Sequence, residues 1–321
     1  MEIIDKLFVT NAPILASSDY LSSLSKDFGY FTEGNLVLPF YKKKKFGFSY
    51  IRCVTGVIGA STVEEETIFL NNVINYIREN QLTDLVAAPH TCALFNSVPD
   101  GSVYCPFGSY IVDLSKSEED LFSAIHTKHK NVIRKAQKDG VIISNADEYK
   151  KQCWNLINAT ATRQHLGGIS ENEFKKLSSS PNWDFYVALF EGEPVGASLL
   201  AWSEYGSYYM HGGSAEKTHA GAMNLLHWTA RLNMKKRGVK RYDFVGARIN
   251  PIPCSKQEGI QRFKSRFGGE LKTGYLWKYP ISPVKVKLYD IYIYLKNYLR
   301  HSYTKDIIDQ ENSNNQNRRS L

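Results

Sequence analysis

The feature that most constrains the fold is the order of elements predicted for residues 183–278. Three strand-like runs, rich in β-branched and aromatic residues, precede a long helix, a fourth strand and a second helix. These elements lie at 183–190, 195–202, 207–215, 222–237, 242–248 and 259–269. The third run ends in HGGSA, so His211 comes at the end of a strand, beside two glycines that allow close backbone approach. A sheet that opens onto a loop with cations on both sides can hold a bulky anionic substrate, so this segment indicates an enzyme.

The rest of the chain repeats this alternation of strands and helices, which predicts an α/β fold. Ser115 and Ser117 each precede an acid by three residues, and this capping-box spacing predicts a helix over 118–139 that Gly140 ends. The same order of elements on either side of that helix predicts two copies of one fold. The expected parts are a first domain, a connecting basic helix, a second domain, a C-terminal helical segment and a disordered polar tail. They are placed at 1–117, 118–140, 141–280, 281–305 and 306–321.

The composition favours an anionic partner and a reducing compartment. A net charge of +8 over 321 residues suits a nucleotide, a nucleic acid or a lipid headgroup. The five cysteines include no CxxC pair, so neither a disulfide framework nor a cysteine zinc site is expected. The chain opens without a basic segment followed by an apolar run, and no apolar run reaches the roughly 18 residues of a membrane span. We therefore expect a cytoplasmic protein.

Four motifs resemble, in their order and spacing, the Fem family of peptidoglycan-bridge aminoacyltransferases. They are HTKHKNVIRKAQKDGV at 126–141, YYMHGGS at 208–214, YDFVGA at 242–247 and GIQRFKSRFGGEL at 259–271. The resemblance implies two tandem GNAT-like acyltransferase domains packed side by side. It also implies transfer of an aminoacyl group from transfer RNA to a lysine amine of a lipid-linked or nucleotide-linked peptidoglycan precursor. Other relatives belong to surface-polysaccharide pathways, where the implied acceptor is a sugar amine.

Two features depart from the family pattern. No long heptad insertion interrupts the second domain, so no coiled-coil arm is expected. The loop after the GGS turn reads AEKTHAGAM, which offers Lys217 and His219 where the family usually carries a phosphate-binding arginine. In acyl-CoA enzymes the same loop is a glycine-rich pyrophosphate cradle at a helix N-terminus, of which KTHAGA is a degraded version. Both aminoacyl-tRNA and acyl-CoA therefore stay open as the donor co-substrate, and no tightly bound cofactor is expected.

Three side chains are candidates for the chemistry of amide formation, which needs a base for the amine, an oxyanion donor and alignment. His211 is the first candidate base, because imidazole titrates near neutral pH; the alternative is a satisfied core histidine. Asp243 is the second candidate, although an aspartate at a strand end also commonly caps a loop. Lys264 matches the FK lysine of the family, which the resemblance places near the transferred acyl group or the transfer-RNA end; the alternative is a solvated basic face.

Glycines and cations make up the expected substrate-binding set. Backbone N–H groups near Gly212 and Gly213 are candidate oxyanion donors, with a plain glycine turn as the alternative. Like charges at i, i+4 spacing repel unless an anion lies between them, so such pairs indicate an anionic neighbour; a solvated face is again the alternative. The full set is Lys130, Arg134, Lys138, Gly212, Gly213, Ser214, Lys217, His219, Arg248, Arg262 and Arg266.

The run Lys42–Lys45 falls near a phosphate-binding lysine of the family, and a solvated hairpin turn is the alternative. His126 and His129 lack a third ligand, so no metal is expected.

Three functions are consistent with these features. The first is Fem-like aminoacyl transfer to a peptidoglycan precursor. The second is acyl-CoA-dependent N-acylation of an amino sugar in surface-polysaccharide biosynthesis, and the third is a non-catalytic tandem domain that only binds such a precursor. The expected partners are an anionic nucleotide-linked or lipid-linked envelope precursor and transfer RNA, with transient contact at the inner membrane surface and no DNA.

Overall fold

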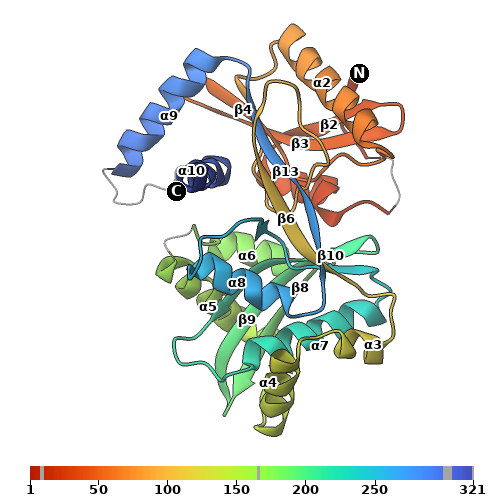
Figure 1. The fold of residues 1–321 in the computed structure, drawn as a ribbon, viewed down its shortest axis with the longest axis vertical. Helices are drawn as coiled ribbons and strands as arrows, with labels where there is room; N and C mark the ends of the chain where they lie inside the picture. The colour runs from red at the N-terminus through yellow and green to blue at the C-terminus, as the bar shows by residue number, and fades with distance from the viewer. Residues whose placement is uncertain (8–10, 165–166, 299–305, 320–321) are drawn as a thin grey trace. The chain divides into compact units, whose positions relative to one another are not determined.

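The chain divides into two compact units, and each unit is built from stretches that are not continuous in the sequence. The computed structural model describes residues 1–7, 11–164, 167–298 and 306–319. The first unit comprises Met1–Ser109, Gly246–Glu258 and Lys272–Leu321, and the second comprises Tyr110–Val245 and Gly259–Leu271. The α/β class expected from the sequence is confirmed (Figure 1). The expected linear division differs from these units, because the chain re-enters the first unit after β11 and again after α8.

The first unit is built from antiparallel hairpins followed by a helix and a parallel strand. Its long helix α2 is capped by Thr62, whose side chain accepts a hydrogen bond from the Glu65 N–H. The elements are β1 (Glu2–Ile4), η1 (Ile14–Ala16), α1 (Ser18–Leu24), β2 (Asp27–Glu33), β3 (Leu36–Lys45), β4 (Phe48–Cys53), α2 (Val63–Glu79), β5 (Leu85–Ala88), β6 (Val103–Asp113), β12 (Ala247–Arg248), β13 (Glu270–Pro280), α9 (Pro283–Tyr298) and α10 (Ile307–Arg319). Strand β6 ends among residues of the second unit, and β13 begins among them.

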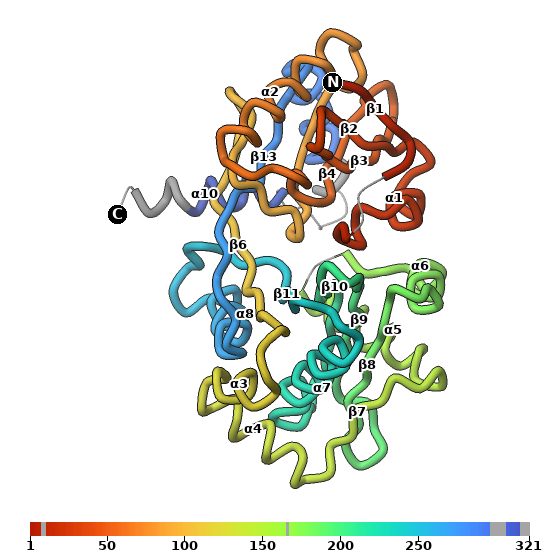
Figure 2. The backbone as a smooth tube through the Cα atoms, turned by 90° about the vertical axis from the view of Figure 1, so that its right-hand side faces the viewer, coloured from red at the N-terminus to blue at the C-terminus, as the bar shows by residue number. Residues whose placement is uncertain are grey.

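The second unit places its helices on both faces of a central set of strands. Figure 2 shows β8 and β9 between α5 and α7. The elements are α3 (Glu118–Ser123), α4 (Thr127–Lys138), β7 (Ile142–Ser144), η2 (Asp147–Tyr149), α5 (Lys150–Arg163), α6 (Glu171–Ser178), β8 (Trp183–Phe190), β9 (Glu193–Ser203), β10 (Gly206–Ser214), α7 (Ala222–Lys236), β11 (Arg241–Asp243) and α8 (Lys256–Ser265), the last of which begins within the first unit. No pair of helices in the described part of the chain forms a coiled-coil arm, as expected.

The strand order repeats between the units. In the first, β1, β2, β3 and β4 pair antiparallel, β4 pairs parallel with β5, and β13 lies antiparallel to β5. In the second, β7, β8, β9 and β10 pair antiparallel, β10 pairs parallel with β11, and β6 lies antiparallel to β11. The last strand of each copy is exchanged, because β6 follows β5 in the chain but pairs with β11, and β13 follows β11 but pairs with β5.

The helix expected over 118–139 is two helices. Ser117 caps α3 as the capping-box spacing predicts, and its Oγ accepts from the Asp120 N–H at 3.0 Å. The helix ends at Ala124, and His126 then starts α4 with its Nδ1 accepting from the Lys128 N–H at 3.1 Å. Both helices belong to the second unit. A connecting helix between two domains was therefore the wrong interpretation of this segment.

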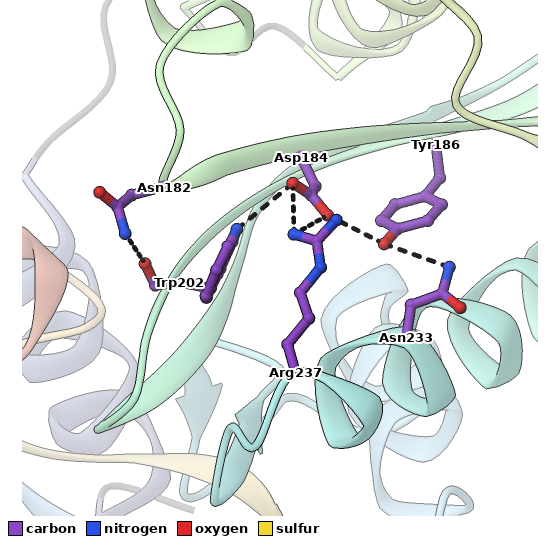
Figure 3. Close-up of polar contacts among 6 residues, drawn as sticks. All are labelled: Asn182, Asp184, Tyr186, Trp202, Asn233 and Arg237. Atoms are coloured by element: carbon purple, nitrogen blue, oxygen red, sulfur yellow. Dashed lines mark hydrogen bonds and ion pairs between the residues drawn. The ribbon is translucent and has the colours of Figure 1, made fainter.

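A polar cluster anchors the C-terminal end of α7 to the strands (Figure 3). Asp184 on β8 accepts from the Arg237 guanidinium at 2.8 Å and from the Trp202 indole N–H at 3.3 Å. Its other neighbour is the Tyr186 hydroxyl, which donates to it at 3.1 Å and accepts from Asn233. Every acceptor of this carboxylate is used, so the cluster fixes the orientation of α7 rather than offering a site.

The C-terminal segment is more ordered than its composition suggests. Residues 307–319, expected to be a disordered tail, form α10, with residues 320–321 outside the described part. Ile308 is fully buried beside Cys105, Phe107 and Leu276. The helical segment expected at 281–305 is α9 over Pro283–Tyr298, and residues 299–305 lie outside the described residues. Ile308, with the partly buried Ile307 beside it and the ion pairs of Arg248 and Lys278 with the acids of α10, therefore docks a helix that is otherwise polar.

Candidate active site

The candidate site lies where two parallel strands of the second unit diverge. Strands β10 and β11 pair only through Ser207–Tyr242 and Tyr208–Asp243. Beyond these pairs β10 continues along β9 as far as Ser214, while the chain leaves β11 at Phe244. His211, expected at the end of a strand, therefore lies on the part of β10 that β11 no longer covers. Beyond Tyr208 this edge of β10 is therefore not paired with β11.

His211 is positioned by a β-bulge. The pairing of β10 with β9 passes from Tyr209–Leu200 to His211–Leu199, so Met210 is the extra residue. A bulge bends its strand and re-aims the side chains that follow, and bulges are common beside active sites. The imidazole of His211 is partly buried and makes no hydrogen bond to another described residue. Burial lowers its pKa below the ordinary value, so the ring is neutral at pH 7 and can accept a proton.

Asp243 and Lys264 meet at one residue, Val245, on the other side of the divergence. The Asp243 carboxylate accepts from the Val245 N–H at 2.7 Å, and the Lys264 ammonium donates to the Val245 carbonyl. Val245 has a φ of +51°, which a β-branched residue rarely adopts without support. Asp243 is buried, and this contact is the loop cap that the sequence left open as its alternative role. Lys264 is half-buried, so it does not lie on an open solvated face.

Aromatic rings and a buried histidine fill the space beneath the divergence. The ring of His227 on α7 lies 4.5 Å from Tyr209 on β10 and 5.6 Å from Phe263 on α8, between centroids. Its Nδ1 shares a hydrogen bond of 2.9 Å with the Tyr242 hydroxyl. Burial, and then the charges of Arg231 and Lys264, lower the pKa of His227 to about 3. The ring is therefore neutral and connects β10, β11, α7 and α8 at one point.

Sequence reasoning missed the second buried group, Arg231, which lies one turn after His227 on α7. It is fully buried, and its guanidinium lies between the rings of Trp228 and Phe267. Nη1 donates to the Phe267 carbonyl at 3.0 Å, while Nε and Nη2 have no partner among the described residues. Arg231 thus holds the end of α8, the helix that carries Lys264. The available signal was His227 and Arg231 at i, i+4 within an apolar helix.

The glycines of the HGGS motif serve packing. A Cβ on Gly213 would lie 2.2 Å from the Leu156 carbonyl oxygen, so only glycine lets α5 approach β10 this closely. Gly212 pairs with Ser198 across the β9–β10 ladder. The Ser214 N–H donates to the Thr160 hydroxyl at 3.0 Å. The N–H of Ser214 is therefore already used.

The basic stripe on α4 is partly occupied by local contacts. Lys130 donates to the Ser123 carbonyl at the end of α3, at 3.1 Å. The Arg134 guanidinium lies 5.2 Å from the centre of the Phe122 ring. Lys138 is exposed and forms no ion pair with another described residue. The structure therefore brings the three cations onto one side of α4, and each contact that it shows is within α3 and α4.

The loop before α7 packs onto α4. The His219 Nε2 contacts the Asp139 carboxylate at 2.8 Å, and its ring lies 4.6 Å from Phe190. A Cβ on Gly221 would lie 2.4 Å from the Val132 carbonyl oxygen. Lys217 is exposed. The backbone of α4 therefore lies directly against the N-cap of α7, where acyl-CoA enzymes hold pyrophosphate.

The remaining predicted arginines are separated. Arg248 lies in the first unit and pairs with the buried Glu311 of α10 and with Gln310. It also lines a hollow of about 330 Å³ with Pro251, Ile252, Ser255, Gln257, Gln310, Ser313 and Asn314. Arg262 is exposed on α8, and the Arg266 carbonyl accepts from the His126 N–H at 2.9 Å. No group of three potential metal ligands gathers among the described residues.

Part of the chain matches a family model, and the fold is similar to that of several solved structures. Residues 190–293 match the model of the FemAB family. The crystal structure of FemX is similar with a TM-score of 0.65 and 14% identity, over 89% of this chain and 99% of that chain. The C-terminal domain of a putative lysylphosphatidylglycerol synthetase from Agrobacterium fabrum is similar with a TM-score of 0.53 and 12% identity, over 84% of this chain and 92% of that chain.

A third solved structure, L-PGS from Bacillus licheniformis, has a TM-score of 0.51 and 13% identity, over 80% of this chain and 85% of that chain. No curated protein matches the sequence. The matched segment begins at the end of β8 and includes β10, α7, β11 and α8, so it contains His211, Asp243 and Lys264. The resemblance to a Fem-like protein, inferred from the motifs, is thereby confirmed.

Proposed function

We propose that this protein is an acyltransferase that forms an amide bond on an amine of a cell-envelope precursor, by Fem-like aminoacyl transfer to a peptidoglycan precursor. The observation that carries the proposal is the neutral His211 on the uncovered edge of β10, opposite the Asp243–Val245–Lys264 contact. The match to the FemAB family over this segment supports it. So does the similarity to FemX and to a synthetase named for lysylphosphatidylglycerol.

The proposed chemistry is a direct attack of the acceptor amine on the aminoacyl ester. The amine nitrogen forms a bond to the ester carbonyl, and its proton passes to the His211 imidazole. The tetrahedral intermediate then collapses, the ester C–O bond breaks, and the imidazolium returns the proton to the leaving hydroxyl. Backbone N–H groups on the uncovered edge of β10 are the candidate donors to the oxyanion. The positive charge of Lys264 is expected to stabilise the negative charge that develops nearby.

The packing before α7 favours aminoacyl-tRNA over acyl-CoA as the donor. A pyrophosphate cradle requires free N–H groups and open space at the helix N-terminus. Here the Val132 carbonyl lies against Gly221, and His219 is held by Asp139. A carbonyl oxygen at this place repels phosphate, so the usual acyl-CoA position is unfavourable.

Purified protein incubated with each donor and acceptor class tests the proposal. We expect amide product from aminoacyl-tRNA with a nucleotide-linked or lipid-linked peptidoglycan precursor, and none from acetyl-CoA with an amino sugar. A thermal shift with the precursor alone, and none with acetyl-CoA, gives an independent check, because a ligand that binds only the native state stabilises it. Product from acetyl-CoA alone, or binding of the precursor without turnover of any donor, would contradict the proposal.

A further inference from the structure

Helix α9 is held on the first unit by one of its faces. Val286, Tyr289 and Ile293 lie on that inner face, at i, i+3 and i+7, and each is partly buried. The Tyr289 ring stacks on Phe48 of β4, with centroids 4.1 Å apart and planes 10° from parallel. At the start of the helix the Lys285 ammonium contacts the Asp84 carboxylate at 2.9 Å. These contacts fix which side of α9 faces away from the unit.

The opposite face of α9 is apolar and exposed. Val284, Leu288, Ile291 and Leu295 follow the spacing i, i+4, i+7 and i+11, so they form one stripe. Their exposed fractions are 72%, 62%, 49% and 55%. An amphipathic helix on a globular protein normally turns its apolar stripe inward. Here the four-residue aliphatic stripe faces outward, and Val286, Tyr289 and Ile293 on the opposite face pack on the unit.

The hairpin between β3 and β4 adds an aromatic tip beside this stripe. Phe46 is 82% exposed and contacts Tyr292 of α9 edge-on, with centroids 5.8 Å apart. The run Lys42–Lys45, expected between two strands, instead forms the end of β3, and Lys43, Lys44 and Lys45 are exposed just before Phe46. The four stripe residues of α9, together with Phe46 and Tyr292, are called the α9 surface below.

Cations border the α9 surface. Lys287 is exposed next to Leu288, and the three hairpin lysines precede Phe46. Asp290 is the single acid in the sequence of α9, against three lysines, Lys285, Lys287 and Lys296. An aliphatic stripe flanked by tyrosines and lysines is the pattern of helices that lie in the plane of a lipid interface. A protein partner would not require the lysine border, whereas an anionic headgroup layer matches it.

We propose that the α9 surface docks the protein on an anionic phospholipid bilayer. The aliphatic stripe and Phe46 enter the headgroup–acyl boundary, and the lysines bind the lipid phosphates. None of the helices in the described part of the chain has the length and apolar character that crossing a bilayer requires, so the contact is peripheral. This inference goes beyond the proposed function and stands without it, because no residue of the α9 surface belongs to the candidate active site.

Co-sedimentation with vesicles tests the docking surface. We expect the full chain to bind vesicles of phosphatidylglycerol and phosphatidylcholine at least tenfold more tightly than vesicles of phosphatidylcholine alone. The double variant Leu288→Gln, Ile291→Gln should bind the anionic vesicles about tenfold more weakly, because two inserted side chains are lost. The double variant Lys44→Gln, Lys45→Gln should lose the preference for anionic lipid. Ile68→Gln, at an apolar position of α2 that is 55% exposed, is the matched control and should bind like the wild type.

Two results would overturn the proposal. One is equal binding to anionic and neutral vesicles, or unchanged binding of the Leu288→Gln, Ile291→Gln variant. The other is a wild-type dimer in analytical ultracentrifugation that this variant dissociates, which would assign the α9 surface to a second copy of the chain. All these side chains are exposed, so the variants should keep the wild-type thermal unfolding midpoint.

Discussion

Asp243 and Lys264 bind opposite ends of the same residue: the Asp243 carboxylate accepts from the N–H of Val245, and the Lys264 ammonium donates to its carbonyl. The residue between them is a valine at a φ of +51°, a conformation that needs support from its neighbours. The sequence predicts a catalytic role for both side chains. The structure shows that both also hold the backbone conformation of Val245, just after β11.

Asp243→Asn should separate the two roles of this carboxylate. The amide oxygen of asparagine can still accept from the Val245 N–H, but it cannot take up a proton. Because the observed contact is a loop cap, we expect Asp243→Asn to keep the turnover rate within about threefold, while Asp243→Ala loses at least tenfold. Steady-state kinetics of both variants decides the point. A loss in Asp243→Asn as large as in Asp243→Ala would instead make Asp243 the base.

Lys264→Ala is expected to lower turnover by at least tenfold while the protein stays folded. The variant removes a positive charge beside the divergence of the strands and the donor to the Val245 carbonyl. Lys256→Ala, an exposed lysine of the same helix α8, is the control and should be near wild type. Thermal unfolding checks that the fold is retained. Wild-type turnover in Lys264→Ala would remove this residue from the site.

The basic stripe on α4 should affect binding rather than chemistry. If Lys130, Arg134 and Lys138 contact substrate phosphates, Arg134→Glu should raise KM at least tenfold with little change in kcat. The wild-type KM should also rise steeply with salt, because neutralised phosphates release counterions. Lys128→Glu, an equal charge change at an exposed position of α4, is the control. A flat salt response, or equal effects of the two substitutions, would leave the stripe as a solvated helix face.

Acid should destabilise the second unit through its buried histidines. Burial, and then the charges of Arg266, His126 and Arg231, lower the pKa of His129 to about 4 from 6.5. Between these pH values the unfolded chain binds more protons than the folded one, so stability rises with pH and is lost as pH falls. His129→Phe keeps a ring beside Phe263 and Phe267 but cannot be protonated. Urea unfolding across this window should show a slope smaller by up to about 1.4 kcal/mol per pH unit; an unchanged slope would refute the assignment.

Local pattern predicted the second unit well, because its elements are set by short-range signals. The expected strands at 183–190, 195–202 and 207–215 are β8, β9 and β10 within two residues, and the expected helix at 222–237 is α7. The place of His211 at the end of a strand followed from the same pattern. Its neighbours did not, because the Met210 bulge depends on how β10 pairs with β9.

What the sequence left hidden depends on contacts between distant segments. The exchange of β6 and β13 depends on the pairing of β6 with β11 and of β13 with β5, and short sequence patterns do not specify which strands pair. An arginine is expected at the surface from its residue type alone. The burial of Arg231 becomes favourable because its guanidinium lies against the rings of Trp228 and Phe267, and these contacts form only in the folded chain. Likewise α10 is polar in composition, and it is held by Ile308 and by the contacts of Arg248 and Lys278 with its acids.

The most direct test of the account is the pH dependence of kcat/KM for wild type and His211→Gln, with aminoacyl-tRNA and a peptidoglycan precursor as substrates. Burial lowers the pKa of His211, so the wild-type rate should persist below pH 6.5 and fall only at lower pH, as the base becomes protonated. His211→Gln should be slower by about 10²- to 10⁴-fold and should lack that acid limb. A His211→Gln variant with the wild-type rate and the same acid limb would contradict the assignment of His211 as the base.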